Sequence, residues 1–130
     1  MKTFRNPDSV HQPQGTYTHQ VELQGPERLL VISGQVGARP DGSIPEDKYE
    51  QLDNVLDNIG NNLKAAGMDF GDVIKITYFL VGEWDLGPLR EKMRARFAGQ
   101  PPCSTMLFVA GLASPAYRVE IEAWASQTVE

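Results

Sequence analysis

Residues 73–81 of this chain read Val-Ile-Lys-Ile-Thr-Tyr-Phe-Leu-Val, and this stretch decides the fold class. It is rich in β-branched and aromatic residues, which is typical of a central strand. Alternate side chains of a strand point to opposite faces. One face would carry Ile74, Ile76, Tyr78 and Leu80, and the other Val73, Lys75, Thr77 and Phe79. Apolar groups on both faces predict a strand inside a sheet that is covered on each side.

An amphipathic helix is predicted on each side of this strand in the sequence. In the first helix Pro45 suits the first helical position, Glu46 and Asp47 lie near the positive end of the helix dipole, and Gly67 suits the C-terminal cap. Its apolar stripe comprises Tyr49, Leu52, Val55, Leu56, Ile59 and Leu63. Asp85 is the expected N-cap of the second helix. That helix would bury Leu89, Met93 and Phe97.

Four more strands are expected, over residues 17–23, 29–32, 104–110 and 117–125. Residues 1–15 are rich in Pro, Asn, Asp and Gln and predict an irregular N-terminal arm. The resulting order is β-β-α-β-α-β-β. This order predicts an α/β (α+β) protein with one mixed sheet and two helices on one face.

The predicted layout leaves one sheet face without a helix. Both the apolar run Leu29–Ile32 and the strand at 73–81 place large side chains on that face. Soluble monomers rarely expose a sizeable apolar patch. We therefore expect copies of the chain to associate through the open face.

Length and charge narrow the function classes. The chain has 130 residues and a net charge of −5, which predicts one domain over residues 1–130. No block of Lys and Arg is present, so phosphate neutralisation does not favour nucleic acid as a partner. The sequence contains no run of about 18 apolar residues, so no membrane span is predicted.

The N-terminus and the cysteine content predict a cytoplasmic protein. Residues 1–7 lack the apolar core of a signal peptide. The single cysteine excludes an intrachain disulfide, which fits a reducing compartment. Neither histidine lies in a Cys/His cluster, so we expect no metal site and no cofactor.

Two stretches near the C-terminus carry candidate chemistry. Glu120 and Glu122 are two residues apart on a predicted strand, so their carboxylates emerge on the same face. One of them is a candidate general base if another subunit covers that face. Alternatively, both are solvated strand residues. Cys103 follows two prolines, and a lone cysteine more often fills core space than acts as a nucleophile.

Small polar groups elsewhere give weaker signals. Ser104 and Thr105 are candidate ligand donors, although hydroxyls at a strand start often bond to nearby backbone. Tyr17 in the first strand and the pair Ser33-Gly34 at a strand end specify nothing on their own.

Taken together, these segments resemble the RidA/YjgF family over about residues 6–125. The matching segments are Asn6-Pro7, Gly15-Thr16-Tyr17-Thr18-His19, Ser33-Gly34-Gln35-Val36, Gln51 to Gly67, Asp72 to Leu80, Pro101-Pro102-Cys103-Ser104-Thr105 and Val119 to Ala123. The resemblance implies a chorismate-mutase-like fold and a homotrimer with a small-molecule cleft between neighbouring subunits. Active members hydrolyse reactive enamines and imines, such as 2-aminoacrylate, to a ketoacid and ammonia.

The resemblance also implies roles for individual residues. Glu120 would position the attacking water, and Tyr17 and Thr105 would orient the substrate. Ser33 and Gly34 would line the cleft. Cys103 stands where the active deaminases carry an arginine that binds the substrate carboxylate by a bidentate pair.

That replacement leaves two functions open. One is a hydrolytic deaminase-type enzyme whose substrate is not 2-aminoacrylate, with Arg39 or Arg118 as possible sources of positive charge. The other is a non-catalytic trimer that binds a small metabolite or acts as a scaffold. RNA cleavage, a third reading, fits the acidic composition least.

Overall fold

A four-stranded sheet in the order β3-β6-β4-β5 forms the centre of the computed structural model, which describes all of residues 1–130. The strands are β3 (Glu27–Val36), β4 (Val73–Val81), β5 (Cys103–Val109) and β6 (Val119–Thr128). The last strand, β6, runs antiparallel to both β3 and β4, while β4 and β5 are parallel. The mixed sheet of the sequence prediction is confirmed.

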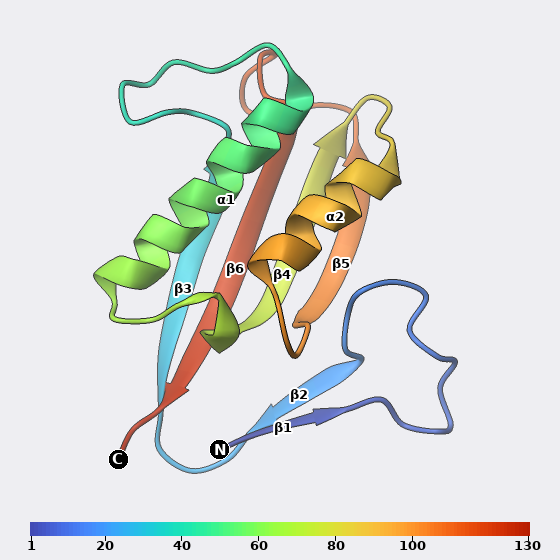
Figure 1. Cartoon of the computed structure of the whole chain (residues 1–130), viewed down its shortest axis with the longest axis vertical. Helices are drawn as coiled ribbons and strands as arrows, with labels where there is room; N and C mark the ends of the chain where they lie inside the picture. Colours follow the sequence, from blue (N-terminus) through green and yellow to red (C-terminus); the bar gives the residue numbers. More distant parts are fainter.

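Helices α1 (Lys48–Ala65) and α2 (Leu86–Arg96) cover one face of this sheet (Figure 1). Helix α1 begins three residues later than Pro45, because the Asp47 carboxylate accepts a hydrogen bond from the Glu50 backbone N–H and so forms the N-cap. Gly67 follows the helix with a φ of 71°, as expected of a residue that ends a helix in the left-handed conformation. Asp85 caps α2 as predicted.

The core lies between the helices and the sheet. The predicted stripe of α1 is buried there except for Tyr49, which is half buried. Leu89, Met93 and Phe97 are buried as predicted. The sheet contributes these side chains to the core: Ile32, Ile76, Tyr78, Leu80, Val119, Ile121, Ala123 and Ala125. Val73 also lies in this core and not on the face of Phe79, because the β4–β6 register shifts between Val73 and Lys75.

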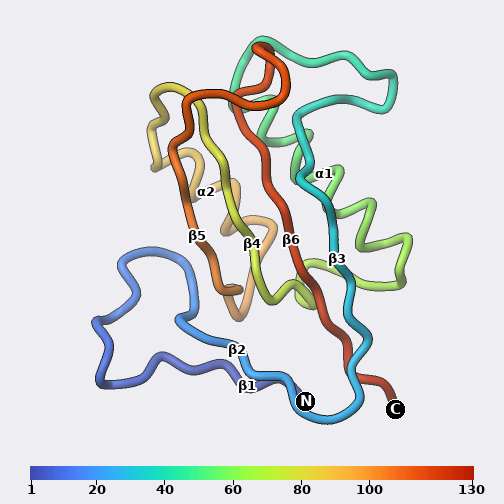
Figure 2. The backbone as a smooth tube through the Cα atoms, turned by 180° about the vertical axis from the view of Figure 1, so that it is seen from behind, coloured from blue at the N-terminus to red at the C-terminus, as the bar shows by residue number.

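The opposite face of the sheet carries no helix (Figure 2). Strand register places Leu29, Val31, Leu107 and Trp124 on it, with between 40% and 58% of each residue's surface exposed. The open apolar face predicted from the sequence is therefore present. A single chain leaves it uncovered.

The first 25 residues depart from the prediction. Residues 2–5 form a strand, β1 (Lys2–Arg5), where an irregular arm was expected. It pairs antiparallel with β2 (Gln20–Leu23) in a separate two-stranded sheet, so not every strand joins one sheet, and β2 begins later than the predicted residue 17. Arg5 and Glu22, 2.6 Å apart, help to hold the pair. A strand of four residues is too short for its alternation to be read from sequence.

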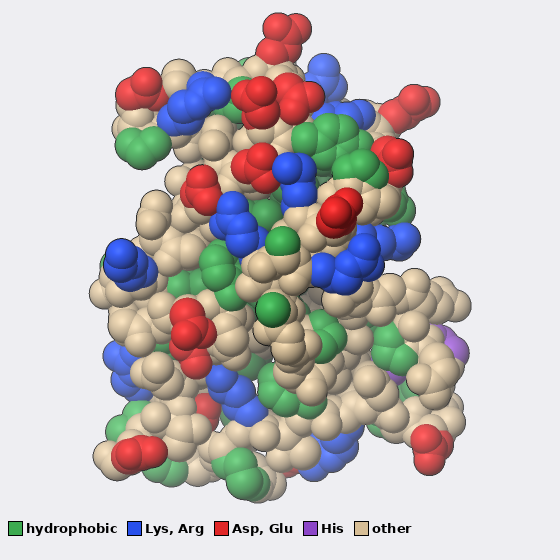
Figure 3. All heavy atoms as spheres, in the orientation of Figure 1, with side chains coloured by type: hydrophobic (Ala, Val, Ile, Leu, Met, Phe, Trp, Pro, Cys, Tyr) green, Lys and Arg blue, Asp and Glu red, His purple; other side chains and the backbone are tan.

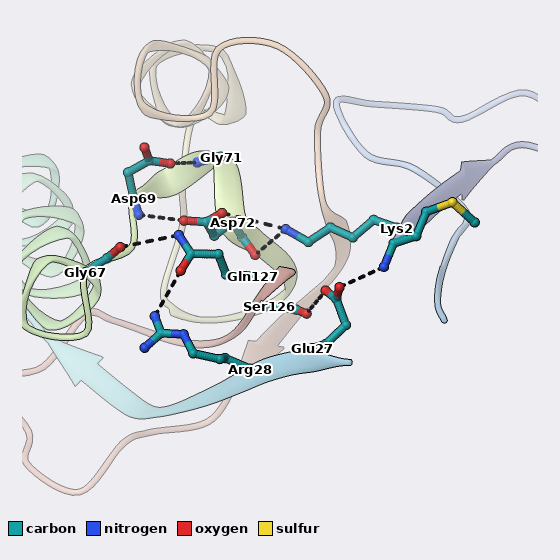
Figure 4. A network of polar contacts seen from close by, with 10 residues as sticks. Lys2, Glu27, Arg28, Gly67, Asp69, Gly71, Asp72, Ser126 and Gln127 are labelled. Carbon is teal, nitrogen blue, oxygen red and sulfur yellow. Dashed lines mark hydrogen bonds and ion pairs between the residues drawn. The ribbon is translucent and has the colours of Figure 1, made fainter. Parts of the chain in front are cut away.

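Polar contacts tie this small sheet to the lower end of the main one (Figure 4). The Glu27 carboxylate accepts hydrogen bonds from the Met1 amino group at 2.7 Å and from the Ser126 hydroxyl at 2.6 Å. These bonds lower the pKa of Glu27 to about 2. Lys2 reaches Asp72 of the short 3-10 helix η1 (Phe70–Asp72), 3.8 Å away. The two sheets are thus fixed to one another.

Candidate functional site

A β-bulge on the open face brings Glu120 over Gly34. Between Ile32 and Gln35 the β3–β6 register shifts, so that Ser33 and Gly34 of β3 lie opposite Glu122 alone. Glu120 pairs with Val36, and its side chain reaches diagonally over Gly34. A Cβ at position 34 would overlap the carboxylate oxygen of Glu120 and lie 2.7 Å from its Cδ. Glycine is therefore the residue that leaves space for this half-buried carboxylate.

Cys103 and Thr105 lie on the same open face, next to a lysine. Register pairs Lys75 of β4 with Cys103 and Thr77 with Thr105. The Lys75 ammonium group donates a hydrogen bond of 2.7 Å to the Thr105 hydroxyl. A cation thus lies beside the position where a family resemblance leads one to expect arginine.

The surroundings of Cys103 do not favour a reactive thiolate. Desolvation raises the pKa of this half-buried thiol, and the nearby charge of Lys75 opposes the rise only in part. The thiol is therefore protonated at neutral pH, which disfavours a role as a nucleophile.

Tyr17 lies elsewhere, in a pocket at the edge of β5 on the helix-covered side. The pocket has a volume of about 210 Å³ and is formed by the loop between β1 and β2 (residues 6–19, called the arm below), β4, β5 and α2. Its lining residues are Gln14, Gly15, Thr16, Tyr17, Tyr78, Arg90, Met93, Ser104 and Met106. Within one chain the structure therefore brings Glu120 together with Ser33 and Gly34, but it does not bring Tyr17 to them.

The arm reaches this pocket because Thr18 fixes it to the turn before β5. The Thr18 backbone N–H donates to the Pro102 carbonyl at 3.1 Å, and its hydroxyl donates to the Pro101 carbonyl at 2.6 Å. Only 2% of Thr18 is exposed. Tyr17 then accepts a hydrogen bond from the Gln14 N–H at its phenol oxygen.

Neither arginine named from the sequence lies near Cys103 in the same chain. Arg39 is 3.6 Å from Glu50 and bonds to Ser43 in the loop before α1. The Arg118 carbonyl accepts from the Val81 N–H at the far end of β4. That end is six residues from Lys75, or roughly 20 Å along the strand.

Three residues near these sites were not singled out as functional from the sequence: Lys75, Tyr78 and Arg90. Lys75 could have been identified from the sequence, because a single cation within an apolar strand is expected to face a neighbouring subunit or a ligand. Arg90 had none, since cations are common on exposed helix surfaces.

The titration of Tyr78 tests whether the interior of the pocket is shielded from water. Burial raises the pKa of its phenol to about 12, while the positive charge of Arg90 acts to lower it. The unfolded state ionises near pH 10, so the folded state loses stability as the pH rises from about 10 to 12. Tyr78→Phe should flatten this alkaline decline. Tyrosinate absorbance and denaturant titrations at several pH values check it, and an equal decline in the variant would contradict it.

The arrangement defines a class: a two-layer α+β domain with a polar site on an uncovered sheet face. The Endoribonuclease L-PSP family matches residues 8–127, so the chain belongs to this family, which is the RidA/YjgF family. The chain is 38% identical over 115 residues to the mouse 2-iminobutanoate/2-iminopropanoate deaminase, covering 87% of this chain and 82% of that protein. The human protein of the same name is 35% identical, covering 78% and 74%.

Solved structures agree with the fold. A conserved Rid-family protein of unknown function from Yersinia pestis, YyfB, superposes with a TM-score of 0.85 at 28% identity, covering 95% of this chain and 97% of that one. The Escherichia coli YjgF structure gives 0.68 at 29% identity, covering 87% and 89%. Neither helix of the present chain is long and apolar enough to cross a membrane.

Proposed function

We propose that this chain forms a cytoplasmic homotrimer that hydrolyses a small imine or enamine in a cleft between subunits. Glu120 is its water-activating carboxylate. The observation that carries the proposal is the placement of this half-buried carboxylate over Gly34 in the β3 bulge. Bulges often re-aim a side chain beside an active site. The names of the mammalian relatives add support, since both are imine deaminases.

The need for several subunits follows from where the candidate groups lie. Tyr17 lines a pocket under α2, whereas Glu120 lies on the open face with β4 between its strand and β5. A neighbour seated on the exposed apolar face would cover Leu29, Val31 and Trp124. It would also supply the second half of each cleft. Sedimentation at several protein concentrations tests this, and a monomer at micromolar concentration would contradict it.

The proposed reaction adds water to a carbon–nitrogen double bond. Glu120 takes a proton from water while the water oxygen bonds to the imine carbon and the C=N π electrons move to nitrogen, and Glu120 then returns this proton to that nitrogen. In the resulting carbinolamine Glu120 moves the hydroxyl proton to the amino nitrogen. The O–H electron pair forms the carbonyl, the C–N bond breaks, and ammonia leaves. Tyr17 and Thr105 orient the substrate, and Ser33 with the Gly34 backbone binds its oxygen.

The substrate is proposed to differ from 2-aminoacrylate, because Cys103 provides no positive fork for the carboxylate next to the reacting carbon. Ammonia release from freshly generated 2-iminopropanoate tests this restriction. Fast turnover that is lost in Glu120→Ala and unchanged in Cys103→Ala would refute it.

Restoring the arginine should create the missing activity. A charge-assisted hydrogen bond is worth about 1.5–3 kcal/mol, so Cys103→Arg should raise kcat/KM for 2-iminopropanoate by about 10- to 150-fold. We expect an increase near the lower end of this range, because position 103 is half buried and the new arginine would lie beside Lys75, whose positive charge repels it. Cys103→Gln is the uncharged control. An equal gain in both variants would show that charge is not the cause.

A non-catalytic trimer that binds a metabolite remains the alternative function. It is favoured if ligands bind the clefts while no imine is hydrolysed. RNA cleavage is not proposed, because Lys and Arg side chains over the helices are interspersed with Asp and Glu (Figure 3). The ion pairs Lys92–Asp53 and Arg96–Asp57, at 2.9 and 2.8 Å, consume two of these cations.

A further inference from the structure

The pocket beneath α2 contains hydrogen-bond donors that the fold does not use. Tyr78 and Ser104 both line it, and their hydroxyls bond to no other residue; since no buried side-chain oxygen of the chain lacks a partner, both hydroxyls are open to solvent in the pocket. Only 7% of Tyr78 is exposed, so its hydroxyl is reached through the pocket. Unpaired hydroxyls in a small concave site are suited to hold a ligand oxygen.

Arg90 adds a positive charge to the same pocket. Its Nη2 atom lies 4.0 Å from the point where a Cβ would stand at Gly15, so the guanidinium extends over the arm. Its charge also acts on the phenol of Tyr78. The two groups therefore face the same space from α2 and β4.

Arg90 is not engaged by any acidic side chain. The ion pairs of the chain use the Met1 amino group, Lys2, Arg5, Arg39, Lys92 and Arg96. On α2 itself, Lys92 and Arg96 bind Asp53 and Asp57 of α1, whereas Arg90 lines the pocket. The helix thus uses two of its four cations to hold its neighbour and leaves Arg90 and Arg94 without an ion pair; of these two, only Arg90 lines the pocket.

We propose that Arg90, with the Tyr78 and Ser104 hydroxyls, forms a subsite for the carboxylate of a small organic acid. A planar guanidinium fork matches a carboxylate, and the hydroxyls donate to the remaining lone pairs. The volume of about 210 Å³ admits a metabolite-sized acid and lies below the roughly 300–1,000 Å³ of pockets for larger ligands.

This subsite rests on the proposed function and refines its substrate class. Ser104 and Cys103 are adjacent on β5 and therefore point to opposite faces of the sheet. The substrate keeps an anionic group, but this group is bound on the helix-covered side of β5 and not at position 103. Arg90 of α2 thus supplies the positive charge that is absent at position 103.

The test is a calorimetric titration of the full chain with acetate, butanoate and 4-oxopentanoate, each compared with its primary amide. We expect at least one acid to bind, and its amide to bind at least tenfold more weakly. Arg90→Met should weaken binding of the acid at least tenfold and abolish the difference from the amide. The same variant should raise the pKa of Tyr78, because the opposing charge is gone.

Arg94→Met is the matched control, since Arg94 lies one turn further along α2 and does not line the pocket. It should bind the acid as the unmodified chain does. Unchanged binding in Arg90→Met, equal losses in both variants, or no binding of any acid would each overturn the subsite. Glu120→Gln should keep acid binding. A chain without hydrolase activity that still binds acids through Arg90 would refute the proposed reaction alone.

Discussion

Glu120→Gln should lower kcat for imine hydrolysis by about 10²- to 10⁴-fold, the range that a positioned general base contributes. Glutamine keeps the size and hydrogen-bonding shape of the side chain but cannot accept the proton of the attacking water. Because Glu120 is only half buried, we expect little change in stability. The measurement is single-turnover ammonia release, with thermal unfolding of the same samples as the check on folding.

Glu122→Gln provides the matched control for this experiment. Both glutamates lie on β6, point to the same open face and are half buried. The Glu120 carboxylate reaches over Gly34, whereas Glu122 lies across from the bulge on the neighbouring strand. A comparable loss in both variants would mean that the general negative charge of the face matters, and that Glu120 has no special role.

Gly34→Ala is a second way to test the Glu120 carboxylate, because it displaces the side chain without changing its chemistry. The added methyl would overlap the end of the Glu120 side chain, which is flexible enough to turn away. We therefore expect activity to fall while the melting temperature changes little. Full activity in this variant would contradict the proposed placement of the attacking water.

Gln51→Leu is expected to give the largest loss of stability. Gln51 is 1% exposed, and its amide N–H groups donate to the carbonyls of Pro45 and Ala116, each at 2.9 Å. Its carbonyl oxygen accepts from the Arg118 N–H at 2.8 Å. The side chain thus joins the loop before α1 to the segment that leads into β6.

Leucine fills a similar volume but pairs with none of these backbone groups. A buried polar group left unpaired costs about 1–3 kcal/mol, so the three together should lower the free energy of unfolding by at least about 3 kcal/mol. The residue has little freedom to move aside, because a Cβ on the neighbouring Gly37 would already lie 2.5 Å from the Gln51 Cβ. Urea unfolding at a fixed protein concentration measures the loss.

Asn62→Leu on the same helix controls for the change of residue type. Asn62 is exposed and bonds only to the Asn58 carbonyl one turn earlier. It should shift the free energy of unfolding by no more than about 0.5 kcal/mol. Similar effects of the two substitutions would mean that the Gln51 hydrogen bonds contribute nothing to stability.

Local sequence rules predicted the two helices and the four strands of the main sheet, because each has its own pattern. Strand β3, however, runs on through Ser33 and Gly34 to Val36, where the sequence predicted a strand end at Ser33. The stripe from Leu52 to Leu63 repeats at helical spacing, and Asp85 is an N-cap that needs no distant partner. Strand β1 was missed since Lys2–Arg5 is stabilised by pairing with β2, some twenty residues away along the chain. The start of α1 was misplaced because Asp47 competed successfully with Pro45 for the terminus.

The sequence by itself determined the fold class, the uncovered apolar face and the absence of arginine at position 103. These depend on periodicity and residue identity, which are local properties. Only the tertiary structure decided which groups meet. It placed Glu120 over Gly34 through a one-residue bulge, Lys75 beside Thr105, and Arg90 over the arm that carries Tyr17. Such meetings depend on strand register and on how α2 lies over β5, and no spacing along the chain encodes either.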